Sequence, residues 1–269
     1  MSLLSAHKQG VGHDHAAENT LEGISRAAKT CDYVEFDVQR CGDGTFVLHH
    51  DGSVLIDGEV RPIEAITHTE FVTATGTTCT LSDVCETLRG RAKAHVDLKF
   101  TSPKVLYATP LDTYEVEAAH IIVSILGEKN AIITTTEDAT VKAVRAWSTD
   151  AAPELLVGLS LGKIVTHLAT REQLKVRISE AFPARRLRKC HANLIVANKV
   201  LASISLVRFA TRHNFPVLVW TVDNESELKK WLRDDRVWMV TTNFPELARR
   251  NSTDDMTPTL ISVPTEDPE

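Results

Sequence analysis

The chain has 269 residues, enough for one large α/β domain or two small ones, with 43% hydrophobic and 25% charged residues, as is usual for globular proteins. The formal net charge is −6 and the basic residues form no stripe, so nucleic acid is not an expected partner. No apolar run approaches the roughly 18 residues of a membrane-spanning helix, so we expect no stable membrane insertion, and the oligomeric state stays open.

Apolar runs alternate with helical patterns along most of the chain. Strands are predicted at 3–7, 33–39, 94–100, 131–135, 155–161, 194–198, 216–222 and 237–242. Helices are predicted at 20–29, 81–90, 112–127, 138–148, 167–181, 200–213 and 224–233. Strands that are each followed by a helix predict an α/β fold, the (β/α)₈ TIM barrel, over residues 1–250. A doubly wound open sheet is the structural alternative.

Two segments interrupt this alternation. Residues 52–80, after the second strand, are predicted to form a short insertion in the barrel domain. Residues 251–269 read NSTDDMTPTLISVPTEDPE, and this richness in Pro, Thr and acids predicts a disordered tail. The five cysteines show no CxxC pair and the N-terminus shows no signal-peptide pattern, which favours reduced thiols in a cytoplasmic protein.

The second predicted strand, YVEFDVQ at 33–39, carries two acids in an apolar run. Alternate side chains of a strand share a face, so Glu35 and Asp37 are expected to point into the barrel while the apolar residues face the helices. Burying unpaired carboxylates is costly, and two neighbouring acids repel each other. A bound cation removes both costs; the alternative is an ion pair with Lys99.

The segment GDGTF follows that strand and predicts a tight hairpin. If Asp43 and Gly44 are its two loop residues, His50 lies directly opposite Asp37. This register returns His50 to the acids and leaves His49 structural or exposed. A three-residue loop would shift the register, and the alternative for His50 is an exposed hairpin histidine.

Polar residues also end the first and third predicted strands. The first ends in His7-Lys8, and in HVDLKF at 95–100 Asp97 and Lys99 share one face of the strand. Such residues at the carboxyl ends of barrel strands are typically functional. For Asp97 and Lys99 the alternative is an ion pair inside the barrel.

Three carboxylates without a cysteine form an oxygen-ligand set, which suits Mg²⁺ or Ca²⁺ better than zinc. Two flanking histidines suit general acid and general base roles, and two lysines add positive charge. A divalent cation, lysines and histidines together predict a site for an anionic, phosphorylated small molecule.

The chain resembles the glycerophosphodiester phosphodiesterase family, a (β/α)₈ group related to phosphatidylinositol-specific phospholipase C. The resemblance spans residues 3–250 and rests on the order and spacing of short motifs. These motifs are His7-Lys8, Glu18-Asn19-Thr20, Glu35-Phe36-Asp37-Val38, Asp43-Gly44, His50-Asp51, Asp97-Leu98-Lys99, Trp220-Thr221-Val222 and VTTNFP at 240–245.

The resemblance implies metal-dependent hydrolysis of glycerophosphodiesters to sn-glycerol 3-phosphate and an alcohol. It implies that His7 and His50 form the acid/base pair. It implies that Glu35, Asp37 and Asp97 bind the metal. It also implies that Lys8 and Lys99 contact the phosphate and that Trp220 lines the pocket for the alcohol. Which histidine is the acid stays open. The alternatives are a lyase that stops at a cyclic phosphate, a non-catalytic phosphate-ester binding barrel, and an amidohydrolase-type metal hydrolase.

Departures from the family pattern concern the fit of the substrate. Lys8 replaces the usual arginine, and a lysine is a point charge where arginine offers a bidentate fork. The segment after it is longer than usual and contains His13-Asp14-His15, which we interpret as a solvated loop. The remaining histidines are interpreted as structural or surface residues: His68, His95, His120, His167, His191 and His213.

Overall fold

The computed structural model of the protein describes residues 2–12, 18–162 and 170–248. In these residues, parallel strands form one closed sheet: β1 Leu3–Ala6, β2 Tyr33–Arg40, β6 Lys93–Leu98, β7 Ala131–Thr135, β8 Leu156–Leu161, β9 Leu194–Asn198, β10 Val217–Trp220 and β11 Met239–Thr242. The sheet closes because β1 pairs with both β2 and β11. The eight-stranded (β/α)₈ barrel is therefore confirmed, and an open sheet is excluded.

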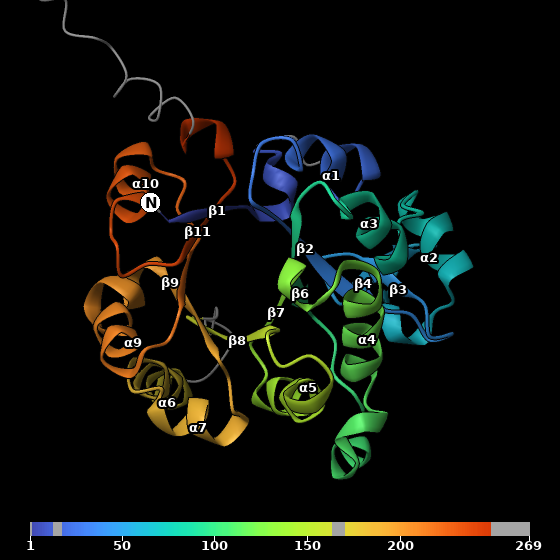
Figure 1. The fold of residues 1–269 in the computed structure, drawn as a ribbon. Coiled ribbons are helices and arrows are strands. Elements are labelled where there is room, and N and C mark those ends of the chain that lie inside the picture. Colours follow the sequence, from blue (N-terminus) through green and yellow to red (C-terminus); the bar gives the residue numbers. More distant parts are fainter. Residues whose placement is uncertain (1, 13–17, 163–169, 249–269) are drawn as a thin grey trace, which may run out of the picture.

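Helices surround these strands (Figure 1). The α-helices of the described residues are α1 Leu21–Ala27, α2 His68–Thr75, α3 Leu81–Leu88, α4 Tyr114–Leu126, α5 Asp138–Ala151, α6 Thr170–Ala181, α7 Ala184–Cys190, α8 Lys199–Leu201, α9 Val207–His213 and α10 Glu225–Leu232. The 3₁₀ turns are η1 His7–Gly10, η3 Ile63–Ala65, η4 Lys104–Ala108, η5 Pro110–Asp112 and η6 Glu128–Asn130, and η7 Ala202–Leu206 is a π turn.

The predicted helices are present, with some differences. Helices α2 and α7 were not predicted, and the single helix expected at 200–213 is interrupted by the π turn η7. No helix in the part of the chain that the structure describes is long and apolar enough to cross a membrane. The predicted tail 251–269 and the motif His13-Asp14-His15 lie outside the described residues.

The main hydrophobic core lies between the barrel and its helices. Strand β2 shows how the sequence produces this, because Val34, Phe36 and Val38 are buried in that core as the alternation predicts. The side chains between them point to the barrel interior, so Glu35 and Asp37 are also buried. The fold therefore places the polar residues of β2 on the inside of the barrel.

The predicted hairpin register is wrong by one residue. Strand β3 (Phe46–Leu48) pairs with β2 so that Val38 faces Leu48. The N–H of His49, not that of His50, donates to the carbonyl of Asp37 at 3.1 Å. The loop has three residues, 42–44, because the N–H of Cys41 donates to the carbonyl of Thr45 at 2.8 Å.

The physical reason includes contacts with the insertion, which the hairpin sequence does not contain. The Asp43 carboxylate accepts the N–H of Thr45 at 3.1 Å and the N–H of His68, from the following insertion, at 2.8 Å. The N–H of Gly42 donates to the carbonyl of Ile66 at 2.7 Å. The wider loop is thus held both by its own turn, in which the N–H of Gly44 donates to the carbonyl of Cys41, and by the insertion.

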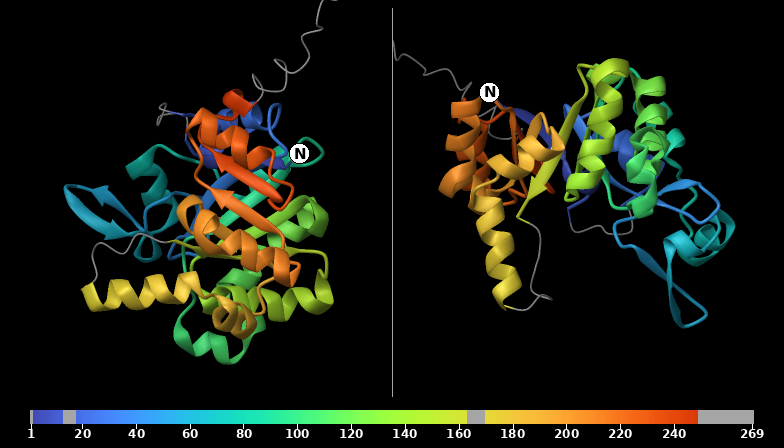
Figure 2. Two further views of the ribbon diagram at one scale, coloured as in Figure 1. Left: turned by 90° about the vertical axis from the view of Figure 1, so that its left-hand side faces the viewer. Right: turned by 90° about the horizontal axis from the view of Figure 1, so that it is seen from below.

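Residues 52–80, predicted as a short insertion, contain a two-stranded ribbon and a helix. Strands β4 (Ser53–Ile56) and β5 (Glu59–Pro62) pair antiparallel, and η3 and α2 follow. The ribbon projects from the side of the barrel (Figure 2, left, blue to cyan). A small apolar cluster, which includes Val54, Ile63 and Phe71, joins this insertion to the β2–β3 hairpin. The insertion is therefore packed onto the hairpin that carries His50.

Candidate active site

A cavity of about 210 Å³ opens at the carboxyl ends of the barrel strands. It is lined by His7, Lys8, Glu35, His50, His95, Asp97, Lys99, Thr134, Thr136, Ser160, Val196, Trp220 and Thr241. Seven of the eight residues singled out in the sequence are in this lining. The eighth, Asp37, lies beside it and contacts Lys99. Although His50 does not lie opposite Asp37 in the hairpin, the loop after β3 directs its side chain into the cavity.

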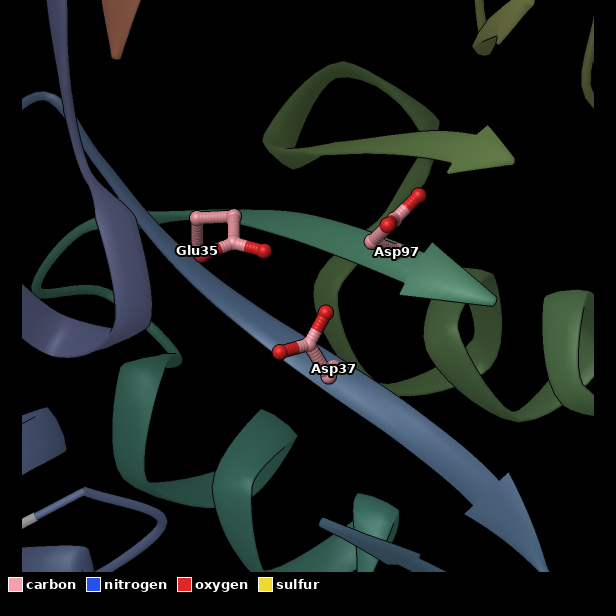
Figure 3. Close-up of side chains that lie close together, drawn as sticks. All are labelled: Glu35, Asp37 and Asp97. Carbon is pink, nitrogen blue, oxygen red and sulfur yellow. The ribbon is translucent and has the colours of Figure 1, made fainter. Parts of the chain in front are cut away.

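Three carboxylates lie together in this site (Figure 3). Glu35 and Asp37 come from β2, and Asp97 comes from the neighbouring β6, where it pairs in register with Asp37. One oxygen of each carboxylate lies within 4.8 Å of one oxygen of the other two. Glu35 and Asp37 are only 3% and 2% exposed, so water screens their mutual repulsion poorly.

The surroundings of Glu35 oppose its ionisation. Burial, the charge of Asp37 and, more weakly, that of Asp97 raise its pKa well above the usual value, although an N–H bond from Lys8 opposes this. That N–H donates to Oε2 at 2.6 Å, because Lys8 adopts a left-handed backbone conformation with a φ of 45°. A buried carboxyl that resists ionisation next to other acids is a position where a cation lowers the free energy.

Lys99 already supplies one positive charge to the cluster. Its Nζ lies 3.1 Å from Asp37 and 2.5 Å from Asp97. Burial lowers the pKa of Lys99, but Asp97 and Asp37 outweigh burial and raise it above its usual value, so the ammonium stays charged. One lysine against three carboxylates leaves an excess of negative charge. The donor set therefore fits a hard divalent cation with oxygen ligands.

His95 belongs to the site, which corrects its interpretation as a structural or surface histidine without a partner. Its Nδ1 lies 3.1 Å from the Ser5 hydroxyl and its Nε2 lies 3.2 Å from the Thr134 hydroxyl. The Thr134 hydroxyl donates to Asp97 at 2.8 Å. Burial lowers the pKa of His95 to about 3, so the ring is neutral. The alternation in HVDLKF already placed His95 on the face of Asp97 and could have identified it.

The two histidines proposed for acid/base roles have different partners. His7 Nδ1 lies 2.8 Å from Asn243 Oδ1, just after β11. His50 Nδ1 lies 2.8 Å from the carboxylate of Asp51, its neighbour in the chain. The ring of His49 instead packs edge-on against Phe71, with the ring centroids 5.7 Å apart. In the sequence, Asn243 stands out only as part of the motif VTTNFP, and no local pattern connects it with His7.

The remaining predicted residues flank the cluster. The Nζ of Lys8 lies 3.7 Å from Glu18 Oε2, at the edge of the cavity. Trp220, the last residue of β10, forms part of the wall, and its buried indole Nε1 has no hydrogen-bond partner among the described residues. A wall that offers an apolar ring with a free N–H suits a ligand with both apolar and polar parts.

A (β/α)₈ barrel with acids, lysines and histidines at the carboxyl ends of its strands is the arrangement of metal-assisted hydrolases. The family model described as the glycerophosphoryl diester phosphodiesterase family matches residues 9–247. The chain therefore belongs to this family, and the enzyme class predicted from its sequence is confirmed. A direct comparison with curated protein sequences finds no match.

Solved structures share the fold at low sequence identity. A glycerophosphodiester phosphodiesterase from Parabacteroides distasonis is 16% identical, with a TM-score of 0.72 and coverage of 95% of this chain and 98% of the other. One from Agrobacterium tumefaciens is 18% identical, with a TM-score of 0.67 over 92% and 99%. The Oleispira antarctica phosphodiesterase OLEI02445, in complex with the product sn-glycerol-3-phosphate, is 18% identical, with a TM-score of 0.66 over 94% and 97%.

Proposed function

We propose that the protein hydrolyses glycerophosphodiesters to sn-glycerol 3-phosphate and an alcohol with the help of a divalent cation. The observation that carries the proposal is the cluster of three carboxylates, two of which line the cavity together with two lysines and the histidines His7 and His50. The family supports the reaction class. The product bound to the Oleispira antarctica phosphodiesterase supports the identity of the phosphate product.

We propose Glu35, Asp37 and Asp97 as the residues that would hold Mg²⁺ or Ca²⁺, because their buried, mutually repelling oxygens fit a hard cation. Bound there, the cation would polarise a phosphoryl oxygen and offset the negative charge that develops on it. Lys8 and Lys99 would contact the phosphate, and Trp220 would pack against the alcohol part of the substrate.

His7 and His50 would move the protons. One would take the proton from the attacking hydroxyl or water, and the other would give a proton to the oxygen of the departing alcohol. His95 is not proposed for this work, because Ser5 and Thr134 occupy its two nitrogens and burial disfavours the protonated ring that proton transfer needs. We further propose one barrel domain over 1–250 with 52–80 as its insertion, 251–269 as a tail, and a cytoplasmic location.

Phosphorus NMR of the purified protein tests the reaction. The substrates are glycerophosphocholine, glycerophosphoethanolamine and lysophospholipids, each with Mg²⁺ or Ca²⁺ and then with EDTA. We expect a phosphate monoester signal that requires the cation. A cyclic phosphate that persists would make the protein a lyase, and no change with any substrate would contradict the proposal.

Replacing Thr134 by valine is expected to weaken metal binding about 10- to 100-fold, the usual cost of losing a group that orients a metal ligand. The substitution keeps the shape of the side chain and removes the hydrogen bond to Asp97. Isothermal titration calorimetry with Mg²⁺ and Ca²⁺ measures the change. The matched control is Thr211→Val, a substitution in α9 at a position far along the sequence from the three carboxylates. This variant should bind the metal as the wild type does. Equal affinities in the two variants would contradict the expected role of Thr134.

A further inference from the structure

His7 is held by a chain of hydrogen bonds that begins in the loop after another strand. Its Nδ1 meets Asn243 Oδ1 at 2.8 Å. The Nδ2 of Asn243 donates to Asp223 Oδ2 at 2.8 Å, and the N–H of Asn243 donates to Asp223 Oδ1 at 2.8 Å. The Thr242 hydroxyl also donates to Oδ1, at 3.2 Å. Asp223 follows β10 and Asn243 follows β11, so the chain joins the loops of two adjacent strands to His7 after β1.

This network determines which atoms of Asn243 and His7 face each other. A carboxylate can only accept hydrogen bonds, so Asp223 must face the Nδ2 of Asn243. The Oδ1 of Asn243 is then the atom that faces His7, and it too can only accept. His7 Nδ1 must therefore carry a proton, and in the neutral ring Nε2 is the nitrogen with a free lone pair. This Nε2 lies 3.9 Å from Glu35 Oε2, on the cavity side of the ring.

We propose that Asp223 and Asn243 are positioning residues that hold His7 in the cavity with the proton on Nδ1 and the lone pair on Nε2. The proposal rests on the proposed function, because it gives His7 the orientation that proton transfer in the cavity needs. An amide at position 243 does this without placing a fourth carboxylate next to the acid cluster. Asp223 supplies the negative charge behind Asn243, at a greater distance from His7. Its carboxylate also prevents the Asn243 amide from exchanging its oxygen and nitrogen positions.

Asp223→Asn tests the proposal because it reverses one donor in the chain. The backbone N–H of Asn243 still needs an acceptor, so the Oδ1 of the substituted residue 223 remains bonded to it. The Nδ2 of residue 223 then faces the side-chain amide of Asn243. Asn243 must then turn its Oδ1 to residue 223 and its Nδ2 to His7. A donor facing Nδ1 moves the ring proton to Nε2, where the lone pair was. In the double variant Asp223→Asn/Asn243→Asp, the carboxylate at position 243 accepts hydrogen bonds both from residue 223 and from His7. The proton therefore returns to Nδ1 of His7.

Long-range ¹H–¹⁵N NMR of histidine-labelled protein reads this tautomer directly, at a pH where the ring is neutral and with His7→Gln to assign the signal. We expect the Nδ1–H form in the wild type and in the double variant, and the Nε2–H form in Asp223→Asn. We also expect Asp223→Asn to lower kcat about 100-fold or more with KM changed less than about threefold, as for a catalytic histidine in the wrong tautomer. The double variant should recover part of kcat.

An unchanged His7 tautomer in Asp223→Asn would overturn the proposal, and so would a folded double variant with the single variant's tautomer. If Asp223→Asn does not fold, Asn243→Ala provides the second test, since His7 should then lose its single Nδ1–H signal and populate both tautomers. The NMR result does not require turnover. A wild type that hydrolyses no diester but shows the expected tautomers would contradict the proposed function and leave the positioning of His7 supported.

Discussion

His50→Ala is expected to lower kcat about 10²- to 10⁴-fold, the contribution typical of a positioned acid or base. The side chain lines the cavity and is 50% exposed, so its removal leaves no buried polar group without a partner. The fold and the binding of a metal should therefore survive. Phosphorus NMR or a coupled assay for the monoester product measures turnover, and circular dichroism checks the fold.

His49→Ala is the matched control, because it removes the adjacent histidine of the same hairpin. His49 packs against Phe71 rather than lining the cavity, so its loss should lower stability slightly and leave kcat near that of the wild type. Equal losses of kcat in the two variants would show that the hairpin, and not the imidazole of His50, is what turnover requires. Retained turnover in His50→Ala would remove His50 from the proposed mechanism.

Glu35→Gln is expected to act in opposite directions on activity and on stability. Activity should fall about 10²-fold or more, because an amide is a poorer cation ligand than a carboxylate and losing a group that only orients such a ligand already costs about 10- to 100-fold. Stability without metal should rise at neutral pH, because burial and Asp37 make the ionised Glu35 unfavourable. Each kcal/mol gained corresponds to roughly 2–4 °C in Tm for a chain of this size.

The pH dependence of this stability difference follows from the direction in which the pKa of Glu35 is shifted. The pKa of Glu35 is raised in the folded protein, so its carboxyl favours folding while protonated. This stability is lost as the pH rises from the unfolded pKa through the folded pKa. The Tm difference between Glu35→Gln and the wild type should thus grow from about pH 4 upward in EDTA, and added Mg²⁺ or Ca²⁺ should stabilise the wild type more than the variant. A lower Tm for the variant at neutral pH would contradict this account.

Glu115→Gln is the control for burial of a carboxylate as such. Glu115 is fully buried in α4, outside the cavity, and accepts hydrogen bonds from the Ser102 N–H and hydroxyl, the Tyr107 hydroxyl and the Thr140 hydroxyl. An amide offers only one oxygen to these donors, so this variant should be less stable than the wild type and retain its activity. The two substitutions should therefore change Tm in opposite directions.

Most of the barrel could be predicted from the sequence because each element has its own local signal. The alternation in β2 separates Val34 and Phe36, which pack under the helices, from Glu35, which faces the interior. The same alternation in β6 places Asp97 beside Asp37 across the strand pair. The gathering of three acids was thus predictable once parallel strands were assumed, because the carboxyl ends of such strands meet at one end of the barrel.

The register of the hairpin could not be predicted from local sequence. Asp43-Gly44 is a good two-residue turn by local preference, yet the structure has a three-residue loop. The difference comes from His68 and Ile66, whose backbone groups bond to the loop from the insertion. A register set by residues more than twenty positions away leaves no trace in the turn sequence itself.

The sequence by itself thus determined the barrel, the acid cluster and the class of enzyme, because alternation and motif order are local properties of the chain. Only the tertiary structure decided which groups hold those residues in place. His95 acquires its partners from β1 and β7, and His7 acquires Asn243 and Asp223 from the far end of the chain. Closing the barrel brings β11 beside β1, and a contact created by closure joins residues that no spacing rule connects.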